Sequence, residues 1–121
     1  FFKGAAKAVA GNRIGDIGSA VYNHAVSNGY GVVKRYVGHG VGHDLHEDPE
    51  VPNFGTAGRG ARLFPGMTIA IEPMINEGTF EVKEKNDGWT VVTADGKLSA
   101  HYEHTVLITP EGEPLLLTYV S

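Results

Sequence analysis

The sequence contains no cysteine among its 121 residues. Disulfide bonds and thiolate metal sites are therefore excluded, and any bound metal would have to be held by nitrogen and oxygen atoms. Runs of Lys or Arg are also missing, and the net charge is −4. A chain of this kind offers no basic patch for a phosphate backbone, so no direct nucleic-acid partner is expected.

Long apolar stretches are missing as well. No segment reaches the ~20 apolar residues that a membrane span needs, and the opening FFKGAAKAVAG lacks the basic leader of a signal peptide. We therefore expect a cytoplasmic protein without a membrane partner. The chain is long enough to bury a core as a single domain, but it begins with Phe1 rather than methionine, so we expect it to be part of a longer polypeptide.

The apolar pattern predicts helices first and strands afterwards. Helical spacing covers residues 1–10 and 13–29, with Asp16 as the N-cap of the second helix and Asn28–Gly29 at its end. Strands are predicted for residues 31–37, 67–75, 102–109 and 115–120, with a hairpin in 89–100 around Asp95–Gly96 and a long loop over 44–64. With 1–29 helical and 30–121 mostly strands, the fold class is α+β, a mostly antiparallel curved sheet backed by helices.

Three segments carry residues that could bind a metal. His39 lies between two glycines in VGHGVG, Glu72 interrupts the apolar run TIAIEPMI, and Glu103 lies in SAHYEHTVLIT. One imidazole and two carboxylates suit a divalent ion in a hydrolytic site. Each residue also has a structural interpretation, such as a half-exposed edge glutamate for Glu72 or a structural turn histidine for His39.

Strand alternation predicts where these side chains point. Glu72 shares its face with the small residues Thr68 and Ala70, and Pro73 removes a ladder donor directly after it. Glu103 shares its face with His101, which we expect to support the metal site from its second shell. His104 points to the opposite face, where a satisfied core or interface histidine is expected.

The remaining histidines are predicted from their positions. His46 follows the glycine-rich turn, where it could donate a hydrogen bond to a substrate oxygen. His43 is expected to be a solvated loop residue, and His24, which lies near the apolar stripe of its helix, is expected to have no role in the site.

Six motifs occur together in order along the chain. They are RIGDIG, GHGVG, LHEDP, FPGMTIAIEPM, DGWTVVT and SAHYEHT. In these motifs the sequence resembles the C-terminal half of the pita-bread metallopeptidases, and within that family the type I methionine aminopeptidases. The resemblance runs from about Gly11 to Tyr119 and implies the C-terminal half of a pita-bread catalytic domain over residues 1–121.

The resemblance also implies roles for individual residues. His39 and Glu72 would bind one of two divalent ions, and Glu103 would bridge both; cobalt, manganese, iron and zinc all fit such ligands. His46 and Glu72 would be catalytic, with His46 on the scissile amide. Leu45 and Trp89 would border the substrate pocket. The implied activity is removal of the initiator methionine from a nascent peptide, with the ribosome as a further partner.

Two departures from the family pattern accompany the resemblance. At His101 the family usually has glutamine, and the N-terminal half, which supplies two aspartate ligands and a further substrate-binding histidine, has no counterpart here. That half is therefore an expected partner, and the chain alone is expected to be inactive. Two alternatives stay open: a proline-directed aminopeptidase of the same fold, and a pita-bread binding module without catalysis.

Overall fold

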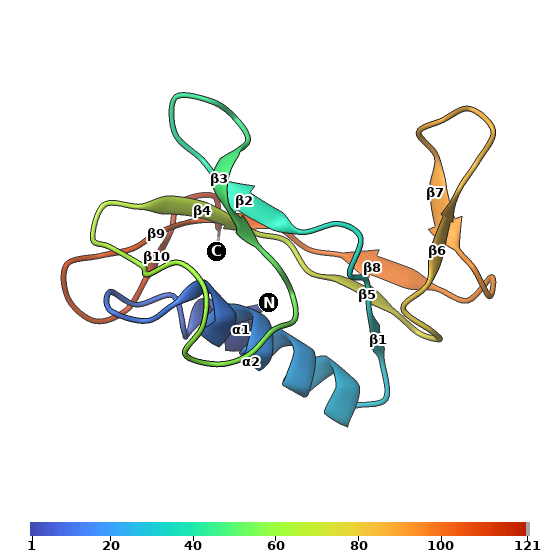
Figure 1. Cartoon of the computed structure of the whole chain (residues 1–121), viewed down its shortest axis with the longest axis horizontal. Coiled ribbons are helices and arrows are strands. Elements are labelled where there is room, and N and C mark those ends of the chain that lie inside the picture. Colours follow the sequence, from blue (N-terminus) through green and yellow to red (C-terminus); the bar gives the residue numbers. More distant parts are fainter. Residues whose placement is uncertain (121) are drawn as a thin grey trace.

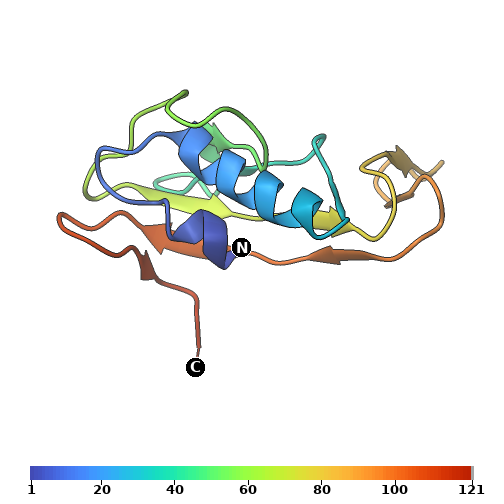
Figure 2. The same cartoon turned by 90° about the horizontal axis from the view of Figure 1, so that it is seen from below.

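Two helices cover one face of a layer of short strands in this computed structural model, which describes residues 1–120 (Figures 1 and 2). The helices are α1 (Phe2–Ala5) and α2 (Ile14–Ser27). The strands, in chain order, are β1 (Gly31–Val32), β2 (Gly38–Gly40), β3 (Glu47–Val51), β4 (Thr68–Ile71), β5 (Met74–Asn76), β6 (Val82–Glu84), β7 (Val91–Thr93), β8 (Ser99–His101), β9 (His104–Leu107) and β10 (Leu115–Leu116). None of the helices in residues 1–120 combines the length and the apolar character needed to cross a membrane.

All strand pairs within residues 1–120 are antiparallel. A five-stranded sheet has the order β10-β9-β4-β2-β3, a three-stranded sheet the order β1-β5-β8, and β6 pairs with β7 alone. The predicted α+β class, with helices behind a mostly antiparallel sheet, is confirmed. The central strand of the five-stranded sheet is β4, which lies between β9 and β2.

The core forms between α2 and the five-stranded sheet. Ile17 of α2 and Ile69, Ile71 and Val106 of β4 and β9 are all inaccessible to solvent. Buried apolar surface stabilises a fold by roughly 25 cal/mol per Å², so this contact contributes to the stability of the sheet. The strands that carry the site are therefore held by the most tightly packed part of the chain.

Helix α2 differs from the prediction at its N-terminal end. Helix α2 begins at Ile14 with Arg13 as its N-cap, and Asp16 is the third helical residue rather than the cap. The Asp16 carboxylate accepts the amide of Arg13 at 2.7 Å and that of Gly58 at 2.8 Å, and these hydrogen bonds lower the pKa of Asp16. The C-terminal end of α2 agrees with the prediction, because its C-cap is Asn28 and the following Gly29 has a φ of 84°.

Helix α1 is shorter than the predicted 1–10. Beyond Ala5, the amides of Lys7 and Ala8 bond to carbonyls three residues back instead of four, so the helix tightens into turns. Gly11 then adopts φ of 92° and reverses the chain toward α2.

Two further corrections concern the chain on either side of β2. The strand predicted for 31–37 pairs only over Gly31–Val32, and the predicted loop 44–64 contains β3, which pairs with β2 through Gly38 and Val51. Pro49 suggested a loop, but β3 is the edge strand of its sheet, where a missing amide donor is tolerated.

The predicted hairpin in 89–100 is also wrong. The hairpin pairs β6 with β7, and Asp87 accepts the amides of Trp89 and Thr90 in its turn. Asp95 instead accepts the amides of Thr79 and Lys97, and the chain continues into β8, which pairs with β5. The last predicted strand, 115–120, is reduced to Leu115–Leu116.

Candidate metal centre

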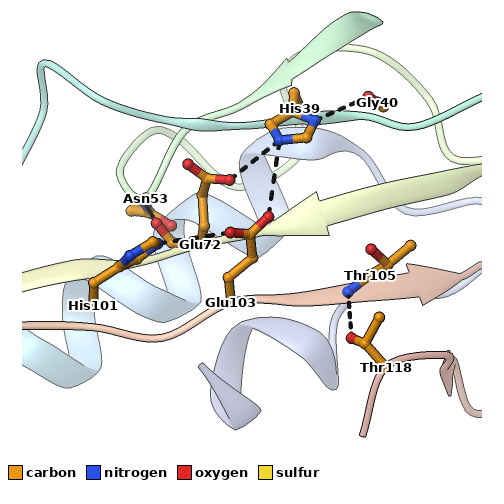
Figure 3. A network of polar contacts seen from close by, with 8 residues as sticks. All are labelled: His39, Gly40, Asn53, Glu72, His101, Glu103, Thr105 and Thr118. Carbon is orange, nitrogen blue, oxygen red and sulfur yellow. Dashed lines mark hydrogen bonds and ion pairs between the residues drawn. The ribbon is translucent and has the colours of Figure 1, made fainter. Parts of the chain in front are cut away.

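His39, Glu72 and Glu103 come together from three separate segments (Figure 3). The His39 Nε2 atom lies 3.2 Å from the Glu72 Oε2 atom and 3.9 Å from the Glu103 Oε2 atom. One ligand atom from each residue lies within 4.8 Å of the other two. The two distances from His39, 3.2 and 3.9 Å, are compatible with bonds of about 2 Å to a common ion.

The local structure of β2 presents His39 to the two carboxylates. His39 lies opposite Ala70 of β4 and Glu50 of β3, and its Nδ1 atom lies 3.0 Å from the Gly40 carbonyl oxygen. A proton on Nδ1 would satisfy that contact and leave the Nε2 lone pair facing the carboxylates, as a metal ligand requires. His39 is the middle residue of the three-residue strand β2.

Gly38 and Gly40 allow β2 to lie this close to its neighbours. A Cβ atom built on Gly38 would overlap the carbonyl oxygen of Ala70, and one built on Gly40 would overlap that of Asp48. Neither glycine has positive φ, so glycine is needed at these positions because a side chain would not fit, and not because of an unusual backbone conformation. The glycines on both sides of His39 therefore fix the distance of its strand from β3 and β4.

Glu72 lies where the strand carrying it is interrupted. β4 ends at Ile71 and β5 begins at Met74, so Glu72 and Pro73 form a break, as the proline predicted. The Glu72 side chain is only 14% exposed. Burial raises its pKa, and the nearby Glu103 carboxylate raises it further, against weaker opposite effects of His39 and His101.

This donor set fits a divalent cation. Two carboxylates that face one another repel when both are ionised, and a cation between them removes that cost. The imidazole nitrogen completes a set of one nitrogen and two oxygen donors of the kind that hydrolytic divalent metals accept. The arrangement can therefore hold an ion through His39, Glu72 and Glu103.

The other predicted site residues lie at different distances from this centre. The His46 ring, in the turn before β3, lies against that of His39 with 3.9 Å between ring centroids. His101 Nε2 lies 3.9 Å from Glu103 Oε1, on the side away from His39. Leu45 is 73% exposed beside His46.

Trp89 lies outside this cluster. It is 78% exposed in the turn of the β6–β7 hairpin, which projects from one end of the long axis, away from β2 and β3 (Figure 1). Its role in substrate binding stays a prediction.

The remaining histidines agree with their predicted surroundings. His24 and His43 are exposed. His104 has hydrogen-bond partners for both ring nitrogens, Thr118 Oγ1 at 2.8 Å and the Tyr102 hydroxyl at 3.0 Å. It is thus satisfied away from the metal ligands.

Asn53 was missed in the sequence. It is fully buried, and its side-chain amide donates to the main-chain carbonyl of Glu72 at 3.2 Å. No sequence signal separates it from the other polar residues of the segment 44–64, which reads as a loop.

The fold and the three converging donors were compared with those of known proteins. A sequence profile of metallopeptidase family M24 matches residues 2–110, so the chain belongs to that family. It is 58% identical over 121 residues, its whole length, to a methionine aminopeptidase of Clostridium perfringens, and 50% identical over 115 residues, 95% of the chain, to methionine aminopeptidase 1 of Bacillus subtilis. It covers 48% and 46% of those two proteins.

Solved structures give the same result. The methionine aminopeptidase of Thermotoga maritima superimposes with a TM-score of 0.94 at 49% identity, over 98% of this chain and 47% of that one. The prolidase of Pyrococcus horikoshii superimposes with a TM-score of 0.69 at 26% identity, over 99% of this chain and 28% of that one. The chain therefore has the fold of these peptidases and spans about half the length of the methionine aminopeptidases.

Proposed function

We propose that this chain supplies the C-terminal, metal-binding half of an aminopeptidase that removes the initiator methionine from new polypeptides. The observation that carries the proposal is the convergence of His39, Glu72 and Glu103 in a chain 58% identical to a methionine aminopeptidase. The peptide substrate would reach the site from the side on which His46 lies beside His39.

Each residue of the site has a role in this proposal. His39, Glu72 and Glu103 would hold two divalent ions together with ligands from the other half, and cobalt, manganese, iron or zinc would suit the donors. When bound, the ions make a water molecule acidic and polarise the scissile carbonyl. Glu72 would take the proton of the attacking water, and His46 would donate a hydrogen bond to the scissile amide.

The substrate pocket would include residues outside the three ligands. Leu45 and Trp89 would border the methionine side chain, and His101 would orient Glu103 from its outer side. The partners are a peptide with an N-terminal methionine, the N-terminal half of the enzyme and, for a co-translational activity, the ribosome. The cytoplasm is the expected compartment.

The alternatives have less support. A proline-directed peptidase shares the fold, but the prolidase superimposes with a TM-score of 0.69 against 0.94 for the methionine aminopeptidase. A binding module without catalysis would have no need of three converging ligands, and this chain retains all three.

The experiment that tests the proposal is complementation. The 121-residue chain alone should release no methionine from a methionyl peptide with any divalent metal, because further ligands must complete a two-metal site. Supplying the part of the Clostridium perfringens enzyme that this chain does not cover, covalently or in trans, should produce turnover that a chelator abolishes. Glu103→Gln in the same complex is the inactive control.

Two outcomes would contradict the proposal. Chelator-sensitive turnover by the isolated chain would show that the other half is dispensable. Preferential cleavage of an X-Pro dipeptide by the complemented enzyme would favour the proline-directed alternative.

A further inference from the structure

Two asparagines are the only fully buried polar or charged residues in the described part of the chain, and they make similar contacts. Asn53 and Asn76 both have 0% exposure, both donate their side-chain amide to a main-chain carbonyl, and both leave the side-chain oxygen without a hydrogen-bond partner. An unpaired buried oxygen costs free energy, so an amide is kept at such a position only where its donor matters. The two differ in the carbonyl they bind.

Asn76 stabilises a local turn. Its amide binds the Thr79 carbonyl at 2.8 Å, three residues along the chain, and it lies in β5 opposite Gly31 and Ser99. The bond closes a local loop and involves none of the three metal-ligand residues.

Asn53 binds the carbonyl of Glu72, 19 residues away, at the break between β4 and β5 (Figure 3). β4 pairs with β2 as far as Ala70 and with β9 as far as Ile71, and Pro73 has no amide hydrogen to extend the ladder. The Glu72 main chain therefore lies outside the regular pairing on both sides of it. The Asn53 amide replaces the ladder partner that the carbonyl of Glu72 lacks.

The position of Asn53 is fixed by the strand that also flanks His39. β3 ends at Val51, which pairs with Gly38, and Glu50 of β3 lies opposite His39. Val51 has no exposed surface, so Asn53 follows two residues after an anchored point. One short segment thus pairs with the strand of His39 and hydrogen-bonds to the backbone of Glu72.

We propose that Asn53 is a positioning residue, which holds the main chain at Glu72 in the orientation that lets Glu72 share a metal ion with His39 and Glu103. The inference rests on the proposed metal-binding function. The direction in which a side chain leaves the backbone is set by the main chain at that residue, and in this orientation the Glu72 Oε2 atom lies 3.2 Å from the His39 Nε2 atom. Residues that orient metal ligands typically change metal affinity about 10- to 100-fold when replaced.

The test compares Asn53→Leu with Asn76→Leu in the 121-residue chain. Leucine has nearly the shape of asparagine and removes one buried amide in each variant, so both lose a similar hydrogen bond. Co²⁺ alone is titrated into each protein, and both the dissociation constant and the visible absorption of the bound ion are recorded. Circular dichroism and thermal unfolding report the fold separately.

We expect Asn53→Leu to weaken Co²⁺ binding by about 10- to 100-fold and to alter the absorption spectrum. Asn76→Leu should change the dissociation constant by less than about threefold and leave the spectrum unchanged, although both variants lose stability. Should Asn53→Leu not fold, Asn53→Ala, measured well below its unfolding temperature, takes its place. Equal Co²⁺ affinities and spectra for Asn53→Leu and the unmodified chain would overturn the inference while leaving the proposed function intact. Failure of the unmodified chain to bind Co²⁺, both alone and with the other half of the enzyme supplied, would overturn both.

Discussion

The five-stranded sheet and the β6–β7 hairpin are built in opposite ways. In β4, three of four residues are buried, whereas none of the six residues of β6 and β7 is buried. The sheet is closed by α2, but the hairpin extends from one end of the molecule (Figure 1). The three predicted ligands lie in or beside strands of the packed sheet, and the predicted pocket residue Trp89 lies on the exposed hairpin. If the proposed function is correct, the buried sheet would carry the chemistry that needs fixed distances, and the exposed hairpin would carry a contact that adapts to the substrate.

The largest effect is expected at His46, which we propose to contact the substrate. In the complemented enzyme, His46→Ala should lower kcat by at least about 100-fold, because a hydrogen-bond donor to the reacting amide is lost. Metal content, measured by atomic absorption, should stay unchanged, since the ring lies beside His39 and outside the ligand triad. Loss of metal in this variant would place His46 among the ligands.

A valine-to-alanine substitution should lower the free energy of unfolding more in the five-stranded sheet than in the β6–β7 hairpin. Val106→Ala in β9 removes two fully buried carbons and leaves a cavity, so it should lower the free energy of unfolding by roughly 2 to 3 kcal/mol. Val92→Ala in β7 removes the same atoms from a half-buried position and should cost less than about 1 kcal/mol. Urea denaturation measures both, and equal losses would show that the hairpin packs as tightly as the sheet.

A smaller, pH-dependent effect is expected at Asp16, which ties α2 to the loop at Gly58. Asp16→Asn should lower the free energy of unfolding by about 0.5 to 2 kcal/mol at neutral pH, the range for lost helix-terminal hydrogen bonds. Because the pKa of Asp16 is lowered in the folded protein, its contribution is present above the ordinary aspartate pKa of about 4 and is lost as pH falls through the folded value. The difference between the two proteins should therefore shrink in acid, and a difference that grows in acid would contradict this account.

The smallest effect on stability is expected for Trp89→Ala. The side chain is 78% exposed, so its removal should change the free energy of unfolding by less than about 0.5 kcal/mol. If Trp89 borders the methionine pocket, KM of the complemented enzyme should nevertheless rise. A large loss of stability with unchanged KM would reverse the division between the rigid and the exposed region.

The three residues that converge in the structure could be selected from the sequence because their signals are local. A glutamate within an apolar strand and a proline directly after it can be recognised within a few residues of sequence. The structure interrupts the strand at Glu72 and Pro73, as the proline predicted. The α+β class followed in the same way from helical spacing before Gly29 and from short β-rich runs after it.

The misjudged features depend on partners distant in the sequence. β3 is a strand because β2 lies beside it, although Pro49 by itself favours a loop. Asp95–Gly96 forms a turn as predicted, but β8 pairs with β5 rather than with β7. Asn53 could not be distinguished, because its importance comes from a carbonyl 19 residues away. Pairing partners of this kind are set by the whole fold rather than by local propensity.

The glycines on either side of His39 limit how this part of the protein can evolve. Every single-nucleotide change that replaces a glycine introduces a side chain, and at Gly38 or Gly40 its first carbon would overlap a carbonyl oxygen of β4 or β3. Backbone atoms cannot move aside as the end of a flexible side chain can, so the neighbouring strand would have to shift and carry its ligand or substrate residue with it. A substitution at Gly38 or Gly40 would therefore require compensating substitutions in β3 or β4, and single mutations at these two positions are expected to be disfavoured.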